Sequence, residues 1–164
     1  MPLAELAVED AEDRALLEVM ITRARNYLEL FGWCREVVET YVSEIAGGRV
    51  VAVLLFRIVP AREGVDEWLW VIVGDLPPAY FPVDGIPSAA DALADYIDEM
   101  QLWVDAAKAG RSIEELIPVE TNDGSMILPP SPELALALEG RLAYLAKEIL
   151  GKKSAGAKRR GLRR

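Results

Sequence analysis

Hydrophobic and polar positions follow a helical period in three long stretches of the chain. Apolar residues recur at three- and four-residue steps over residues 8–31, 88–110 and 131–151, so that each stretch carries one apolar stripe. Ser88 and Ser131 stand where N-caps belong, and a glycine lies at or just past the end of each stretch. The pattern therefore predicts three amphipathic helices.

The segment REVVETYVSEIA, residues 35–46, fits two interpretations. Its β-branched residues favour a strand, but the spacing of Val37, Tyr41 and Ile45 is helical and neither alternate set of positions is cleanly apolar. We expect a fourth helix here, ended by Gly47. If the segment is a strand instead, Gly47 and the glycine after it form a hairpin turn.

Two short, strongly apolar runs predict the strands of a sheet. VVAVLLFRIV (50–59) contains Arg57 as its one polar residue, and WLWVIV (68–73) contains none. Pro60 and Gly64 lie between the runs, which indicates an antiparallel hairpin over 49–59 and 67–75. Both faces of this hairpin are apolar and need cover, from helices or from a partner chain. We expect an α+β fold: a small antiparallel sheet, with room for a third or fourth strand, packed by about four helices.

Composition and charge divide the chain into a body and a tail. With 164 residues and 52% hydrophobic content, residues 1–151 are expected to form one α+β domain. Residues 152–164 carry seven Lys or Arg and no acid, and we expect this tail to be disordered. Without those seven, 11 basic residues face 27 acidic ones, so the body has a charge of −16 against −9 for the whole chain.

The residue types present limit the available chemistry. There is no histidine, which excludes Ser-His-Asp and Cys-His catalysis and His-ligated zinc, and Cys34 is the single cysteine. We therefore lean towards a protein that is not an enzyme and expect no cofactor. The N-terminus lacks the features of a secretory signal, and the apolar runs are too short to span a bilayer, so we expect a cytoplasmic protein.

The stretch GDLPPAYF, residues 74–81, has two interpretations. As a pocket wall, Asp75 would supply a carboxylate while two prolines stiffen an edge that bears Tyr80 and Phe81. As a structural corner, the prolines end one strand and the two aromatic residues return to the core. We favour the corner and keep Asp75, Tyr80 and Phe81 as candidate binding residues.

Arg57, Trp68 and Trp70 are the other candidate binding residues. Trp68 and Trp70 lie two positions apart, on one face of their strand, and either a core or an interface would suit them. We expect burial, in part at a subunit interface. Arg57 needs a partner if it is buried, and an ion pair with Asp66, Glu67 or Asp75 is favoured over a ligand contact.

Several acids of the predicted helix at 88–110 raise the question of a metal site. Asp91, Asp95 and Asp98 stack at steps of four and three, as ligands of a divalent ion could. At ~100° per residue they fall on the side opposite Leu93 and Met100, as the solvated face of a helix does. We expect no metal site, and we keep these three aspartates as the weaker alternative.

The segment from Arg49 through Gly85, with FRIVPAREGVDEWLWVIVGDLPPAYFPVDG, resembles a family of uncharacterised bacterial proteins. The similarity extends through the helix after Ser88 to about Val119. It implies a bacterial cytoplasmic domain and carries no activity, cofactor or catalytic residue with it.

Together these features favour a non-enzymatic interaction or small binding domain that acts as a homodimer or with a protein partner. One alternative is a hydrolase that uses carboxylates and a divalent metal. The other is an acidic immunity-type inhibitor of a basic protein, which the charge of the body would suit. We expect no membrane contact, and nucleic acid binding only through the basic tail.

Overall fold

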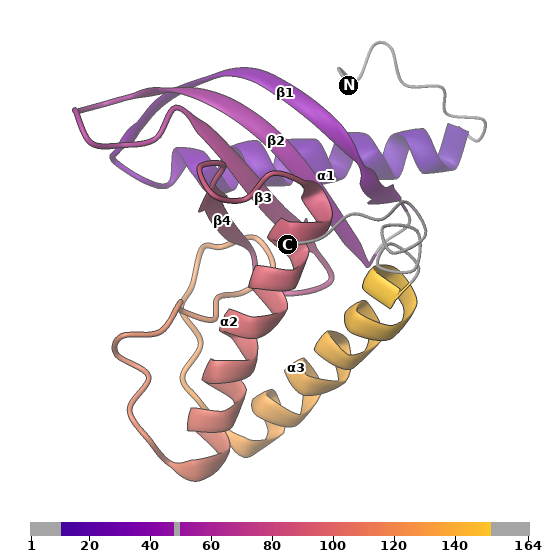
Figure 1. The fold of residues 1–164 in the computed structure, drawn as a ribbon, viewed down its shortest axis with the longest axis vertical. Coiled ribbons are helices and arrows are strands. Elements are labelled where there is room, and N and C mark those ends of the chain that lie inside the picture. The colour runs from indigo at the N-terminus through magenta and orange to yellow at the C-terminus, as the bar shows by residue number, and fades with distance from the viewer. Residues whose placement is uncertain (1–10, 48–49, 152–164) are drawn as a thin grey trace.

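A computed structural model describes residues 11–47 and 50–151 of the chain. Four strands form one antiparallel sheet in the order β1-β2-β3-β4; α1 and α2 pack on it, and α3 packs beside α2 (Figure 1). This is the α+β class that the sequence predicts, with both additional strands present. In chain order the elements are α1 (Ala11–Glu29), β1 (Cys34–Gly47), β2 (Val51–Pro60), β3 (Trp68–Gly74), β4 (Ala79–Pro82), α2 (Ala89–Ala109), α3 (Pro132–Tyr144) and the π-helical turn η2 (Leu145–Leu150).

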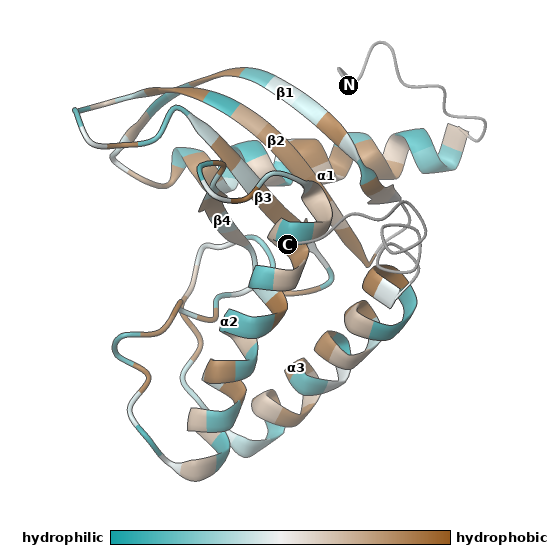
Figure 2. Ribbon diagram, in the orientation of Figure 1, coloured by the Kyte–Doolittle hydropathy of each residue, from teal (hydrophilic) through white to brown (hydrophobic). Residues whose placement is uncertain are grey.

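Helices cover both faces of the sheet. Leu69, Val71 and Val73 of β3 pack with α1, whereas Trp70 and Ile72 pack with α2 and α3. Figure 2 shows the apolar strands between helices that are each apolar along one side. Strands that are apolar on both faces thus find their cover in helices of the same chain, which is one of the two sources of cover that the sequence left open.

Residues 35–46 are a strand and not a helix, which corrects our first interpretation. β1 pairs antiparallel with β2, from Cys34 opposite Pro60 to Gly47 opposite Val51. Three register shifts interrupt the pairing, and at the last of them residues 43–45 oppose Val53 alone. The first two shifts each insert one residue and so move the following side chains to the other face of the sheet, which is why the strand shows no clean two-residue period.

The predicted helices at 88–110 and 131–151 begin where their caps predict. The Ser88 side chain accepts a hydrogen bond from the Asp91 amide, and Gly110 ends α2 with φ at 69°. Ser131 accepts likewise from Leu134 at the start of α3. Because residues 35–46 form a strand, the described residues contain three α-helices where we expected about four.

The stretch at 74–81 is a corner between β3 and β4. At Gly74 φ is 151°, and a Cβ built there would lie 2.1 Å from the Val50 carbonyl oxygen, so the glycine admits the neighbouring strand and not a ligand. The Tyr96 hydroxyl donates a hydrogen bond of 2.6 Å to the Pro77 carbonyl, which ties the corner to α2. Tyr80 and Phe81 then return as part of β4.

A second tight turn brings residues 119–128 against the same corner. Glu120 pairs with Ile127, and the amides of Thr121 and Leu128 donate to the carbonyls of Met126 and Val119. Gly124, with φ at 78°, lies so close to the Tyr27 ring that a Cβ would be 2.5 Å from its Cδ1 atom. The turn therefore holds Glu120 beside the end of α1.

No helix in the described ranges is long and apolar enough to cross a membrane.

Candidate functional site

Four aromatic rings gather where α1 ends beside β4. Tyr27 lies near the end of α1, Phe31 and Trp33 lie in the connection from α1 to β1, and Tyr80 comes from β4. The Tyr80 ring centroid is 6.3 Å from that of Tyr27, 5.2 Å from that of Phe31 and 4.9 Å from that of Trp33. Phe31 and Trp33 stack at 4.9 Å. We call these four residues the aromatic cluster.

A cleft of about 230 Å³ opens on one side of Tyr80. Rings of the aromatic cluster form one wall, and the chain at 117–120 forms the other and contributes Glu120. We call it the acid–aromatic cleft; its lining residues are Tyr27, Phe31, Ala79, Tyr80, Ile117, Pro118 and Glu120.

Glu120 is a partly buried carboxylate without an ion-pair partner in the part of the chain that the structure describes. Burial raises the pKa of its carboxyl above the ordinary value. Burial, and after it the charge of Glu120, raises the pKa of the phenols of Tyr27 and Tyr80, so both remain neutral. The cleft therefore combines aromatic faces with one uncompensated negative charge, which is the chemistry that binds an organic cation.

A second hollow of about 200 Å³ lies against Tyr80 and Trp33. Its carboxylate is Asp66, an exposed residue that forms no ion pair within the described ranges. We call it the Asp66 hollow; it is lined by Trp33, Val65, Asp66, Leu69, Tyr80 and Pro82. It repeats the combination of aromatic rings and one free carboxylate.

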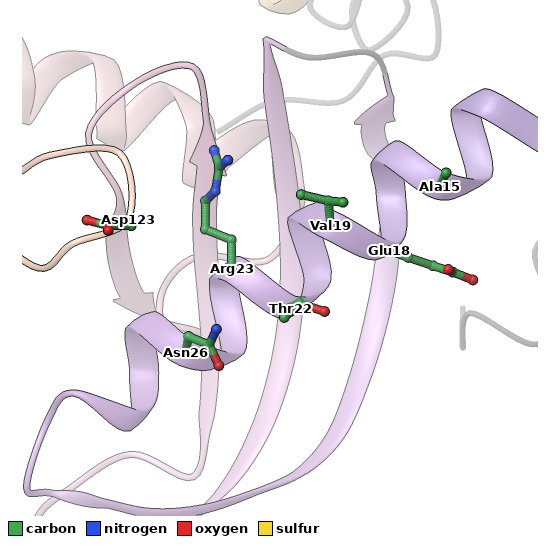
Figure 3. Close-up of a pocket in the computed structure, with 7 residues that line it drawn as sticks. All are labelled: Ala15, Glu18, Val19, Thr22, Arg23, Asn26 and Asp123. Atoms are coloured by element: carbon green, nitrogen blue, oxygen red, sulfur yellow. The ribbon is translucent and has the colours of Figure 1, made fainter.

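A groove of about 570 Å³ runs along α1 and is lined by the residues labelled in Figure 3. Arg23 and Glu18 both extend from α1 but point in different directions (Figure 3). The Arg23 Nη1 atom donates a hydrogen bond of 3.1 Å to the Gly74 carbonyl oxygen. Asp123 accepts hydrogen bonds from Thr121 and Ser125, which lower its pKa to about 2. The charged groups that face this groove already have partners.

The structure brings two predicted residues together at the end of the sheet. Arg57 and Trp68 are register partners on β2 and β3. Arg57 pairs with Glu39 at 2.5 Å and with Glu67 at 2.6 Å, and Trp68 lies 6.1 Å from the Tyr41 ring. Glu67 was among the expected partners of Arg57. This surface is aromatic, but its arginine is compensated by two carboxylates.

The other predicted residues are dispersed. Trp70 and Phe81 are each only 8% exposed in the core beneath α2, and the Trp70 Nε1 donates to the Ile86 carbonyl at 2.9 Å. Asp75 is exposed, forms an ion pair with Arg141 of α3 and lines a groove with Arg23. Of the six predicted binding residues, Tyr80 alone lines the acid–aromatic cleft.

The acidic side of α2 does not assemble a metal centre. Ser88 donates a hydrogen bond of 2.8 Å to the Asp91 carboxylate at the start of the helix, while Asp98 is exposed to solvent. Within the described ranges, no three Asp, Glu or Cys residues lie close enough together to hold a metal ion. Asp95 therefore belongs to no such group.

Sequence reasoning missed Tyr27, Phe31, Trp33, Asp66 and Glu120. Tyr27 and Phe31 fall on the apolar stripe of the helix predicted at 8–31, a pattern that is typical of core residues. Asn-Asp-Gly at 122–124 was an available signal for the turn that places Glu120, because this tripeptide is typical of tight hairpins. Nothing in the linear pattern, however, relates that turn to Tyr80.

Comparisons with protein-family models, with curated protein sequences and with solved structures found no significant match to this chain. The resemblance of residues 49–85 to uncharacterised bacterial proteins thus stays an expectation.

Proposed function

We propose that this protein is a non-enzymatic binding domain that recognises a basic segment of a protein partner through the acid–aromatic cleft. The observation that carries the proposal is the partly buried Glu120, which no described cation pairs with, beside the rings of Tyr27, Phe31 and Tyr80. Keeping a carboxylate charged in such a place costs free energy, and a bound cation offsets that cost by pairing with it.

The size of the cleft favours a side chain over a free small molecule. Pockets that enclose drug-sized ligands measure roughly 300–1,000 Å³. At about 230 Å³ the acid–aromatic cleft is smaller, and it suits the end of one arginine or lysine whose backbone stays outside. The charge of −9 over the whole chain also favours a basic partner. An immunity-type inhibitor that masks a basic surface is one form of this function.

A second copy of the chain is the competing partner. β1 lies at the edge of the sheet and has 14 residues, long enough to pair with another edge. It bears the exposed charges Arg35, Glu36 and Glu44 and is bulged, and both features disfavour pairing between edges. We therefore favour a different protein. Native mass spectrometry should give the monomer mass, and a dimer would move the proposal to β1.

Titration calorimetry with a blocked peptide that contains one arginine, Ac-Gly-Ser-Arg-Ser-Gly-Ser-Gly-NH₂, tests the proposal. We expect measurable binding that Glu120→Gln weakens by about tenfold, since the substitution removes the charge and keeps the shape. Glu114→Gln is the matched control, because Glu114 is exposed and lines none of the described hollows.

Three outcomes would count against the proposal. The peptide could fail to bind, Glu114→Gln could weaken binding as much as Glu120→Gln, or tetramethylammonium could bind as tightly as the peptide. The last result would point to a receptor for small organic cations.

A further inference from the structure

Tyr80 lines two hollows of the same chemistry. The acid–aromatic cleft pairs its rings with Glu120, and the Asp66 hollow pairs Trp33 and Tyr80 with Asp66. Neither carboxylate has an ion-pair partner among the described side chains. By contrast, the charges of Arg57, Asp75 and Lys108 are each compensated by an ion pair with a neighbouring side chain. Two carboxylates that form no ion pair among the described residues thus line neighbouring hollows that share one ring.

We propose that the two hollows bind two basic side chains of a single partner segment, one against Glu120 and one against Asp66, with Tyr80 between them. This inference rests on the proposed function and extends it from one cation to a pair. The occupant is an extended segment of another protein that carries two arginines or lysines on one side.

The two hollows are neighbours because they share a wall. Tyr80 lines both, and Phe31 of the acid–aromatic cleft stacks at 4.9 Å on Trp33 of the Asp66 hollow. In an extended chain, side chains two positions apart emerge on the same side at a distance of about 6–7 Å. A segment of the type Arg-X-Arg therefore matches the pair of hollows better than adjacent arginines, which point to opposite sides.

The faces that line the hollows suit guanidinium groups in particular. Tyr80 lines both hollows, and Trp33 belongs to the Asp66 hollow and contacts Tyr80. Guanidinium groups stack on such rings while they donate hydrogen bonds to a carboxylate, and Trp is the strongest partner in cation–π contacts. The methylene groups of each side chain can pack along the remaining apolar lining, such as Val65 in one hollow and Ile117 in the other.

The test compares the one-arginine peptide with Ac-Gly-Ser-Arg-Ser-Arg-Ser-Gly-NH₂ on the full chain. We expect the two-arginine peptide to bind at least about tenfold more tightly, because its second contact forms at high effective concentration. A third peptide, Ac-Gly-Arg-Arg-Ser-Ser-Ser-Gly-NH₂, has the same charge with adjacent arginines. We expect it to lose most of that advantage.

Variants of the protein assign the second contact. Asp66→Asn should reduce the preference for the two-arginine peptide to less than about threefold while the one-arginine peptide still binds. Asp84→Asn makes the same change of charge at an exposed position that lines neither hollow, and it should leave the preference intact. Circular dichroism of each variant checks that the fold is retained.

Failure of this inference differs from failure of the proposed function. Equal affinities for all three peptides, or equal effects of Asp66→Asn and Asp84→Asn, would overturn the pair of sites while Glu120-dependent binding of one arginine still stood. Loss of the preference in Asp66→Asn alone would support it. If no peptide binds, or if Glu120→Gln changes nothing, both proposals fall.

Discussion

At the scale of single residues, the partial burial of the Glu120 carboxylate has a cost to stability. Its pKa is raised by burial, and no described cation compensates its charge. A carboxyl whose pKa is higher in the folded than in the unfolded chain binds more protons when folded. The free energy of unfolding therefore decreases as the pH rises from the unfolded pKa through the folded one.

Glu120→Gln should remove this pH dependence. We expect the variant to be at least as stable as the parent at pH 7, with the difference disappearing as the pH falls through the raised pKa of Glu120. Urea unfolding at several pH values measures it. The neighbouring phenols of Tyr27 and Tyr80 do not interfere, because their pKa values are raised as well. A variant less stable than the parent at pH 7 would show that Glu120 has a structural role.

Binding should have the opposite pH dependence. A bound cation favours the charged carboxylate, so affinity for the one-arginine peptide should increase as the pH rises through the raised pKa of Glu120 and then level off. Calorimetry across that range checks this, and Glu120→Gln should give a flat profile. A flat profile in the parent would contradict a role for the Glu120 charge.

Gly74 is required by a backbone contact. An added Cβ would lie 2.1 Å from the Val50 carbonyl oxygen, at a φ of 151° that other residues rarely adopt. Gly74→Ala should therefore lower the free energy of unfolding by about 3 kcal/mol. Gly140→Ala is the control, because no atom lies within 4 Å of that Cβ position in α3. It should raise stability by about 0.5–1 kcal/mol, and similar effects of both changes would contradict the account.

At the scale of elements, β1 shows how one side chain can hold an irregular strand. Where residues 43–45 oppose Val53, the Ser43 hydroxyl donates to the Val53 carbonyl at 2.6 Å and accepts from the Ile45 amide at 3.0 Å. A hydroxyl thus replaces part of the ladder that the bulge removes. Thr40, on the same strand, has a buried hydroxyl with no hydrogen-bond partner among the described residues.

These two hydroxyls make a matched pair of tests. Ser43→Ala should lower the free energy of unfolding by about 1–2 kcal/mol, because it leaves a carbonyl and an amide without partners. Thr40→Val, which removes an unpaired hydroxyl at nearly constant shape, should be neutral or slightly stabilising. Hydrogen exchange at the Ile45 amide should accelerate in the first variant and not in the second. Equal destabilisation would show that the bulge does not depend on Ser43.

At the scale of the whole molecule, charge should govern association. A chain with 27 acidic and 18 basic residues attracts a basic segment electrostatically, and dissolved salt weakens this attraction by screening the charges. We expect the affinity for the two-arginine peptide to fall by about tenfold between 0.05 and 0.5 M NaCl. Calorimetry at three salt concentrations measures this. Affinity that does not change with salt would indicate that apolar contacts dominate and would contradict recognition of cations.

The sequence by itself determined the α+β class, the central hairpin and the helix boundaries marked by caps. These features depend on contacts between residues close in the chain, such as Ser88 with the Asp91 amide. The corner at 74–81 was also predictable, because Pro77 and Pro78 cannot continue a ladder. The acidic side of α2 followed from helical geometry alone.

Only the tertiary structure decided the nature of β1 and the site around Tyr80. The bulges of β1 arise from its pairing with β2, so its own spacing looked helical. Glu120 and Tyr80 meet because the turn at 122–125 packs on Tyr27, a contact between segments about a hundred residues apart. Local pattern specifies which face of an element is apolar, but which elements lie side by side depends on packing of the whole chain.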